Sequence, residues 1–186
     1  MTDSSFTVFR RLVTANSASG KSRIVSDAPT PHVLQSGQDR GLVNFWATEG
    51  GAPDLDTQDG AARPVRLEPP SQGTVFRFFQ LAPAAETAVS LEEAEAAAAN
   101  AFELMGAPHV RVDTSRHPSM HRSETLDYII VLRGRVKLLL DEDDAVLEPF
   151  DVVIQRGTNH AWINLGSKPA LLMGVLIDAS KKDTPR

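Results

Sequence analysis

A series of short strand-like segments separated by turn residues dominates the second half of the sequence. Six of them follow one another between residues 128 and 177, and glycine, proline or acidic turn residues separate them. They are Tyr128–Arg133, Arg135–Leu140, Ala145–Glu148, Asp151–Gln155, His160–Asn164 and Ala170–Ile177. Short, evenly spaced strands with turn chemistry between them are typical of antiparallel sandwiches and barrels. The pattern therefore predicts an all-β fold for this half.

The first half carries further strand candidates and one helix. The strand candidates are rich in β-branched and aromatic residues and comprise Phe6–Thr14, Lys21–Ser26, Leu42–Thr48 and Thr74–Leu81. Residues 49–73 are rich in glycine, proline and aspartate, which indicates a surface loop or a poorly ordered segment. Ser90 and Glu93 have the spacing of a capping box, and Gly106 follows the apolar stripe that ends at Met105. We therefore expect one helix over residues 90–105.

The length of 186 residues indicates one domain with peripheral additions. We expect residues 1–73 to form N-terminal strands and a Gly/Pro-rich loop packed on a barrel. Residues 74–178 would form the barrel with its inserted helix, and residues 179–186 a C-terminal tail. Because open sheet edges need covering, the N-terminal strands would complete an edge or reach across to a second subunit. A homodimer is the expected assembly.

Composition excludes several classes of function. The chain has no cysteine, so disulfides, thiolate zinc sites and cysteine nucleophiles are excluded. Its net charge of −5 argues against a nucleic-acid partner, since that binding requires a cationic surface. The apolar runs are far shorter than the roughly 20 residues that span a bilayer, and the opening segment lacks the features of a secretory signal. We expect a soluble, cytoplasmic protein without a membrane partner.

Histidines are the residues to examine, because a metal site without cysteine normally uses imidazole. Of the five histidines, His121 and His160 lie in the predicted barrel. If residues 120–127 are extended, His121, Ser123 and Asp127 share one face, because side chains alternate along a strand. His160, Trp162 and Asn164 likewise share a face of a later strand. Polar faces on two short strands are unusual for a core, where buried polar groups need partners.

These two stretches resemble the two motifs of the cupin superfamily, in its single-domain, RmlC-like, conserved-barrel form. In MHRSETLDYIIVLRG, His121 takes the place of the first motif histidine and Ser123 that of the second. Asp127 stands where the family has glutamate, and Gly134 follows after six residues.

In PFDVVIQRGTNHAWIN, three residues match the second cupin motif, namely Gly157, His160 and Asn164. Gln155 replaces the motif proline, and Pro149-Phe150 replaces the turn glycine. The resemblance covers Thr74 to Asp178 and implies a double-stranded β-helix, or jelly roll, with extra N-terminal strands and one inserted α-helix.

The resemblance also implies a metal site, because metal-binding cupins direct three histidines and one glutamate into the barrel. Here the corresponding set is His121, Asp127 and His160, two imidazoles and one carboxylate that suit Fe(II), Mn(II) or Zn(II). The alternative is a metal-free pocket in which His121 and Asp127 form a hydrogen-bonded pair. Such a pair would act as a general acid and base, with the carboxylate fixing the imidazole tautomer.

The resemblance and the apolar strands together favour an enzyme that acts on a hydrophobic or aromatic organic molecule. Dioxygenase, isomerase, dehydratase and decarboxylase all remain open, because one scaffold hosts many chemistries. The candidate substrate-binding residues are Ser123, Gln155, Trp162 and Asn164, and Arg116 and Arg122 flank His121 where they could contact an acidic substrate. The alternative function is a non-catalytic cupin that binds a small ligand as a sensor or carrier.

Overall fold

The computed structural model describes residues 6–7, 9–55, 58–84 and 90–179. Eleven strands and one α-helix form within them. The strands are β1 (Arg10–Asn16), β2 (Ser22–Pro29), β3 (Val33–Gly37), β4 (Arg40–Thr48), β5 (Thr74–Leu81), β6 (Thr125–Arg133), β7 (Val136–Leu140), β8 (Asp144–Leu147), β9 (Val152–Arg156), β10 (His160–Asn164) and β11 (Ala170–Asp178). The α-helix is α1 (Leu91–Leu104), which a short 3₁₀ turn, Pro108–Val110, follows.

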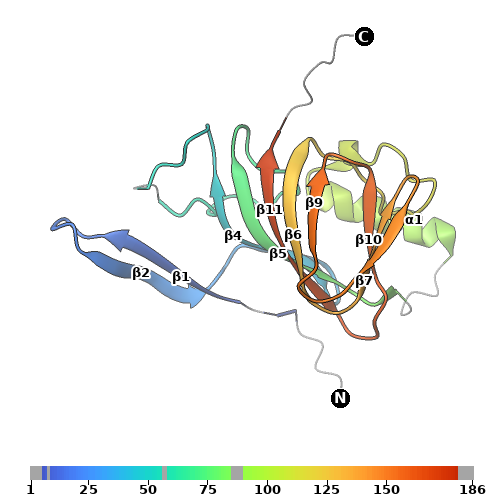
Figure 1. The fold of residues 1–186 in the computed structure, drawn as a ribbon, viewed down its shortest axis with the longest axis horizontal. Helices are drawn as coiled ribbons and strands as arrows, with labels where there is room; N and C mark the ends of the chain where they lie inside the picture. Colours follow the sequence, from blue (N-terminus) through green and yellow to red (C-terminus); the bar gives the residue numbers. More distant parts are fainter. Residues whose placement is uncertain (1–5, 8, 56–57, 85–89, 180–186) are drawn as a thin grey trace, which may run out of the picture.

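Two antiparallel sheets form the body of the molecule (Figure 1). The larger has the strand order β3-β4-β5-β11-β6-β9, and the smaller has the order β10-β7-β8. Some neighbours in the sheet order are far apart in sequence, as β5 and β11 are, so the chain crosses between the sheets. The fold is an all-β jelly roll with one α-helix, as the sequence predicted.

The main core lies between the sheets, where alternate residues of β6, β7 and β11 face inward. It is built from Ile129, Val131, Val136, Ala170 and Leu172, each at most 4% exposed. Gly134, with φ at 91°, makes the tight turn from β6 to β7, a conformation that favours glycine. This packed region forms the floor beneath the cavity described below.

The N-terminal part joins the barrel through a strand that the sequence did not predict. β3 pairs with β4, and β4 pairs with β5, so these strands extend the larger sheet beyond β5. This is the first of the two arrangements expected for the N-terminal strands. The domain boundary at residue 73 stays a prediction, and residues 180–186 of the expected tail lie outside the described part of the chain.

Aromatic rings cover the outer face of β4 and β5. The ring of Phe78 lies 5.0 Å from that of Phe9 and 4.6 Å from that of Phe45. Beside them, Arg11 forms two hydrogen bonds of 2.8 and 2.6 Å to the carboxylate of Asp59. These contacts attach the start of the chain to the sheet, while the β1–β2 hairpin extends away from the body (Figure 1).

The Gly/Pro-rich segment 49–73 is more than a surface loop. Ala61 and Val65 are buried, at 0% and 9% exposure. The backbone N–H of Leu67 donates to the carbonyl oxygen of Met105 at 3.1 Å, which ties the segment to the end of α1. The segment is therefore a loop that is anchored to the body by the buried side chains of Ala61 and Val65, while residues 62–64 and 66 stay exposed.

The helix agrees with its sequence signals. The Ser90 hydroxyl accepts a hydrogen bond from the backbone N–H of Glu93, and the Glu93 carboxylate accepts one from the backbone N–H of Ser90. Ala98, Ala101 and Phe102 form its buried stripe, and Gly106, at φ 66°, follows its end. Among the described residues, no helix is long and apolar enough to cross a bilayer.

We expect a homodimer that forms through the outer face of β6 and β9. Tyr128 and Ile154 are cross-strand partners there, 42% and 53% exposed, and Val152 adds a third exposed apolar side chain. Adjacent exposed apolar groups of this kind mark association surfaces. Sedimentation should give twice the 20.2 kDa chain mass for the wild type and the monomer mass for Ile154→Lys.

The control is Ile24→Lys, because Ile24 is equally exposed, at 57%, but lies on the β1–β2 hairpin. A monomeric wild type at micromolar concentration, or a dimer that only Ile24→Lys dissociates, would contradict this interface.

Candidate functional site

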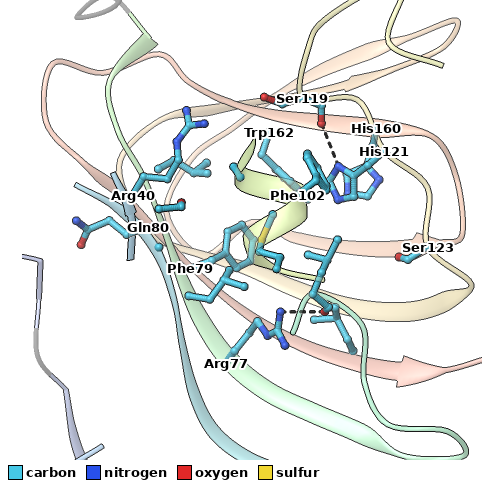
Figure 2. A pocket seen from close by; sticks show the side chains of 18 of the residues that line it. Arg40, Arg77, Phe79, Gln80, Phe102, Ser119, His121, Ser123, His160 and Trp162 are labelled. Carbon is cyan, nitrogen blue, oxygen red and sulfur yellow. Dashed lines mark hydrogen bonds between the residues drawn. The ribbon is translucent and has the colours of Figure 1, made fainter. Parts of the chain in front are cut away.

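One cavity, about 140 Å³ in volume, opens between the larger sheet, β10 and α1 (Figure 2). That volume is close to the roughly 150 Å³ of an apolar cavity that accommodates a benzene ring. Most of its wall is apolar. The apolar side chains come from six elements and the segments beside them: Leu42, Leu67, Phe79, Leu81, Ala98, Ala101, Phe102, Met105, Ile129, Trp162 and Leu176.

His121 and His160 lie together in the wall of this cavity. Each donates its backbone N–H to the backbone carbonyl of the other at 2.9 Å, which forms an isolated bridge at the start of β10. Their imidazole rings are 4.3 Å apart between centroids, and the ring of Phe102 lies 4.9 Å from that of His121. The predicted convergence of these two histidines is therefore observed.

The hydrogen bonds of the two rings fix their tautomers. Nδ1 of His121 lies 3.0 Å from the carbonyl oxygen of Ser119, and Nδ1 of His160 lies 2.9 Å from that of Thr158. Because a carbonyl only accepts, each Nδ1 must carry the proton. In the neutral ring, Nε2 then keeps its lone pair.

Burial keeps both rings neutral. Desolvation, followed by the charge of His160, lowers the pKa of His121 to about 3. Desolvation also lowers the pKa of His160. Both imidazoles are therefore uncharged hydrogen-bond acceptors at neutral pH.

Asp127 lines the same cavity but does not join the histidines. Among the described residues, no three His, Cys, Asp or Glu side chains are close enough together to hold a metal ion. The predicted set of His121, Asp127 and His160 is therefore not assembled, and neither is the predicted His121–Asp127 pair. The expectation failed because residues 121–127 are not one straight strand: β6 begins only at Thr125.

The carboxylate of Asp127 interacts electrostatically with Arg77 instead. Asp127 is 4% exposed, and its Oδ1 has no hydrogen-bond partner. Desolvation raises the pKa of Asp127 to about 6, although the Thr125 hydroxyl and the charge of Arg77 act in the opposite direction. A buried carboxylate without full hydrogen bonding is costly, so the nearby cation is what makes its burial tolerable.

Arg77 is a cavity residue that the sequence analysis missed. It is 2% exposed, and its Nη1 and Nη2 donate to the carbonyl oxygens of Leu67 and Arg66 at 2.9 and 2.6 Å. Burial lowers its pKa to about 10. A signal was present: a lone arginine lies on the inward face of an apolar strand, and arginine is seldom buried without a partner.

Two of the four predicted substrate-binding residues line the cavity. Ser123 is 6% exposed, and its hydroxyl is 2.8 Å from that of Thr125. Trp162 lies with its ring 6.2 Å from Phe79 and 6.0 Å from His160. Trp162 agrees with the alternation expected along its strand, whereas Ser123 precedes β6 and reaches the cavity from the segment before it.

The other two do not line it, because their amides hold turns. Gln155 donates its Nε2 to the carbonyl oxygen of Thr158 at 3.2 Å. Asn164 donates its Nδ2 to the carbonyl oxygens of Leu81 and Lys168 at 3.0 and 2.8 Å. Both residues are at most 3% exposed. The sequence analysis interpreted these polar side chains as substrate contacts, but backbone carbonyl oxygens accept the hydrogen bonds of their amides.

Comparison with known proteins shows that part of the chain is similar to one family. Residues 108–176 match the model of the cupin domain. Relatives include the cupin-domain-containing oxidoreductase fogC of Aspergillus ruber, 37% identical over 65 residues, which are 33% of this chain and 32% of that protein. The cupin-domain-containing oxidoreductase virC of Hypocrea virens is 41% identical over 63 residues, 32% of each chain. The match spans about a third of the length of these curated relatives.

Solved structures with related folds are more distant in sequence. The cupin domain of Cnp3 from Schizosaccharomyces pombe covers 91% of this chain and 87% of its own, with a TM-score of 0.44 and 8% identity. A cupin 2 conserved barrel domain protein from Salinispora arenicola covers 78% and 82%, with a TM-score of 0.40 and 14% identity.

We expect the purified protein to hold metal only weakly. Stable sites use three or more protein ligands, and the described residues bring together only two imidazoles. Metal analysis after purification without chelator should therefore give substoichiometric iron, manganese and zinc. Added Fe(II), Mn(II) or Zn(II) should leave the Tm unchanged, because only bound ligand stabilises by mass action. Near-stoichiometric metal that His160→Ala removes would contradict this expectation.

Proposed function

We propose that the protein is a cupin-type enzyme that acts on a small, apolar or aromatic organic molecule bound in the cavity, since residues 108–176 match the cupin-domain model. One observation carries this proposal. Two buried, neutral histidines line an apolar cavity, and the backbone holds each Nδ1 so that each Nε2 is left as an acceptor. Buried imidazoles with perturbed pKa values in an apolar cavity are typical of functional sites.

The apolar wall supports the choice of substrate. Phe79, Phe102 and Trp162 all line the cavity, so an aromatic ring would meet ring faces and edges on several sides. The two Nε2 atoms would then accept hydrogen bonds from hydroxyl or N–H groups of the bound molecule. Two fixed acceptors orient such a molecule relative to the wall, and orientation lowers the barrier of a reaction.

The metal-dependent form of this function does not fit the described residues. Asp127 lies toward Arg77, and the chain offers the two imidazoles without a third side-chain ligand. Neutral histidines with Nδ1 bound to a carbonyl do have the arrangement common among metal ligands. Two such ligands alone leave a metal weakly held, so our proposal assigns His121 and His160 to substrate binding.

The relatives support enzymatic activity in general terms. FogC and virC are both named as oxidoreductases, and their similarity to this chain covers about a third of each. An oxidation by this chain would require an external oxidant or cofactor, since the proposed site consists of side chains without redox chemistry. The reaction class therefore has to come from experiment.

A non-catalytic cupin that binds the same kind of molecule as a sensor or carrier is the alternative. It requires the cavity and the apolar wall but no chemical change in the ligand. The two functions differ in a single observable, which is the appearance of product.

The test is turnover of aryl alcohols, aldehydes and acids, followed by mass spectrometry with oxygen present and with Fe(II) added in one arm. We expect a product with the wild type. His121→Gln and His160→Gln should each lower kcat by about 10²- to 10⁴-fold, the range for a residue that acts on a proton or a polar group in the reaction.

His109→Gln is the matched control, because His109 is a histidine outside the cavity whose side chain is 64% exposed. Its activity should equal that of the wild type. Ligand binding without product would exclude the enzyme in favour of the sensor or carrier. Full turnover in the His121→Gln/His160→Gln double variant would exclude the role of the histidines.

A further inference from the structure

Among the residues that the structure describes, three charged side chains line the cavity, two of them cationic and one anionic. They are Arg40, Arg77 and Asp127. The Nη atoms of Arg77 donate to two backbone carbonyls, and its charge is compensated by that of Asp127. His121 and His160 are neutral. The cation that remains is Arg40.

Arg40 lies at the rim of the cavity, at the start of β4. The turn from β3 places it there, with Asp39 in the left-handed region at φ 61°. Arg40 keeps an exposed surface, yet desolvation lowers its pKa, as expected for a group between solvent and an apolar interior. Figure 2 shows Arg40 and the two histidines on different sides of the cavity.

Within the part of the chain that the structure describes, Arg40 forms neither an ion pair nor a side-chain hydrogen bond. Desolvation lowers the pKa of His117 and the positive charge of Arg40 lowers it further, so His117 offers Arg40 no compensating charge. A guanidinium has five N–H donors and is strongly suited to a carboxylate. An unpaired one beside an apolar cavity therefore suits an anionic ligand.

We propose that the cavity binds a small apolar carboxylic acid, with the carboxylate on Arg40 and the apolar body between Phe79, Phe102 and Trp162. This inference rests on the proposed function and specifies its substrate class. The charge balance excludes the other classes: an amine would be repelled by Arg40, and a neutral molecule would leave the guanidinium partly desolvated without a partner.

Arg40 thus takes the role that the sequence suggested for arginines beside His121. Arg116 donates instead to the carbonyl oxygens of Leu140 and Asp141, in the β7–β8 turn. Arg122 is exposed and is not part of the cavity wall. The acidic end of the substrate is therefore assigned to a residue of the N-terminal half.

Calorimetric titration with 3-phenylpropanoate, 3-phenylpropanamide and 3-phenylpropylamine tests the inference. The three probes share one apolar body and differ in the charge of the end group. We expect the acid to bind about ten- to hundredfold more tightly than the amide, the range for a hydrogen bond to a charged group. Its Kd should rise with salt, because Arg40 is exposed to solvent.

Arg40→Gln should abolish the preference for the acid and leave the affinity for the amide unchanged. Arg122→Gln is the control and should keep the preference, because it removes the same charge from the exposed segment beside His121. Equal affinities for acid and amide in the wild type, or an unchanged preference in Arg40→Gln, would overturn the inference.

The same titrations separate this inference from the proposed function. If acid and amide bind equally and His160→Gln weakens both, the assignment to Arg40 is wrong and the role of the cavity stands. If none of the three probes binds the wild type, both the inference and the proposed apolar ligand are wrong.

Discussion

The pair of backbone hydrogen bonds between His121 and His160 determines the geometry of the site. These two bonds, each 2.9 Å, join the segment before β6 to the first residue of β10. With the backbone fixed, carbonyl oxygens of neighbouring residues hold both Nδ1 atoms, and the ring of His121 lies against Phe102 of α1. A polar pair in an apolar wall is stable only when its donors are satisfied, and here the backbone satisfies them. The site therefore offers a ligand two neutral hydrogen-bond acceptors, the Nε2 atoms of His121 and His160.

The second half of the fold could be predicted from sequence because its signals are local. Turn residues define the strands from β6 to β11, and the capping box defines α1. Alternation along β10 correctly places Trp162 in the cavity wall, and Ser123 lies there too although it precedes β6. Phe150 shows how strongly the topology constrains the chain: it adopts φ 75°, the left-handed conformation, where the family motif has glycine. The backbone keeps the turn although the residue differs.

The incorrect predictions share one physical origin. Contacts between residues far apart in sequence determine side-chain positions that local sequence patterns do not reveal. The prediction that His121 and Asp127 share a face required an extended chain between them. The segment bends before Thr125, and the charge of Asp127 interacts with that of Arg77. Buried amides at Gln155 and Asn164 looked like ligand contacts and prove to hold turns. Arg40 comes from β4, which the resemblance did not cover, and Arg77 comes from β5, which was predicted to belong to the barrel but lies outside both motifs. Only the pairing of β4 with β5 and of β5 with β11 brings them to the histidines' cavity.

The central claim is that His121 and His160 are both neutral, with the proton on Nδ1 and the lone pair on Nε2. Long-range ¹H–¹⁵N correlation spectra of ¹⁵N-labelled protein at neutral pH measure this directly, with His121→Gln and His160→Gln to assign the signals. The account predicts an unprotonated Nε2 shift for both rings, unchanged down to mildly acidic pH. Imidazolium shifts at neutral pH, or an unprotonated Nδ1 in either ring, would contradict it.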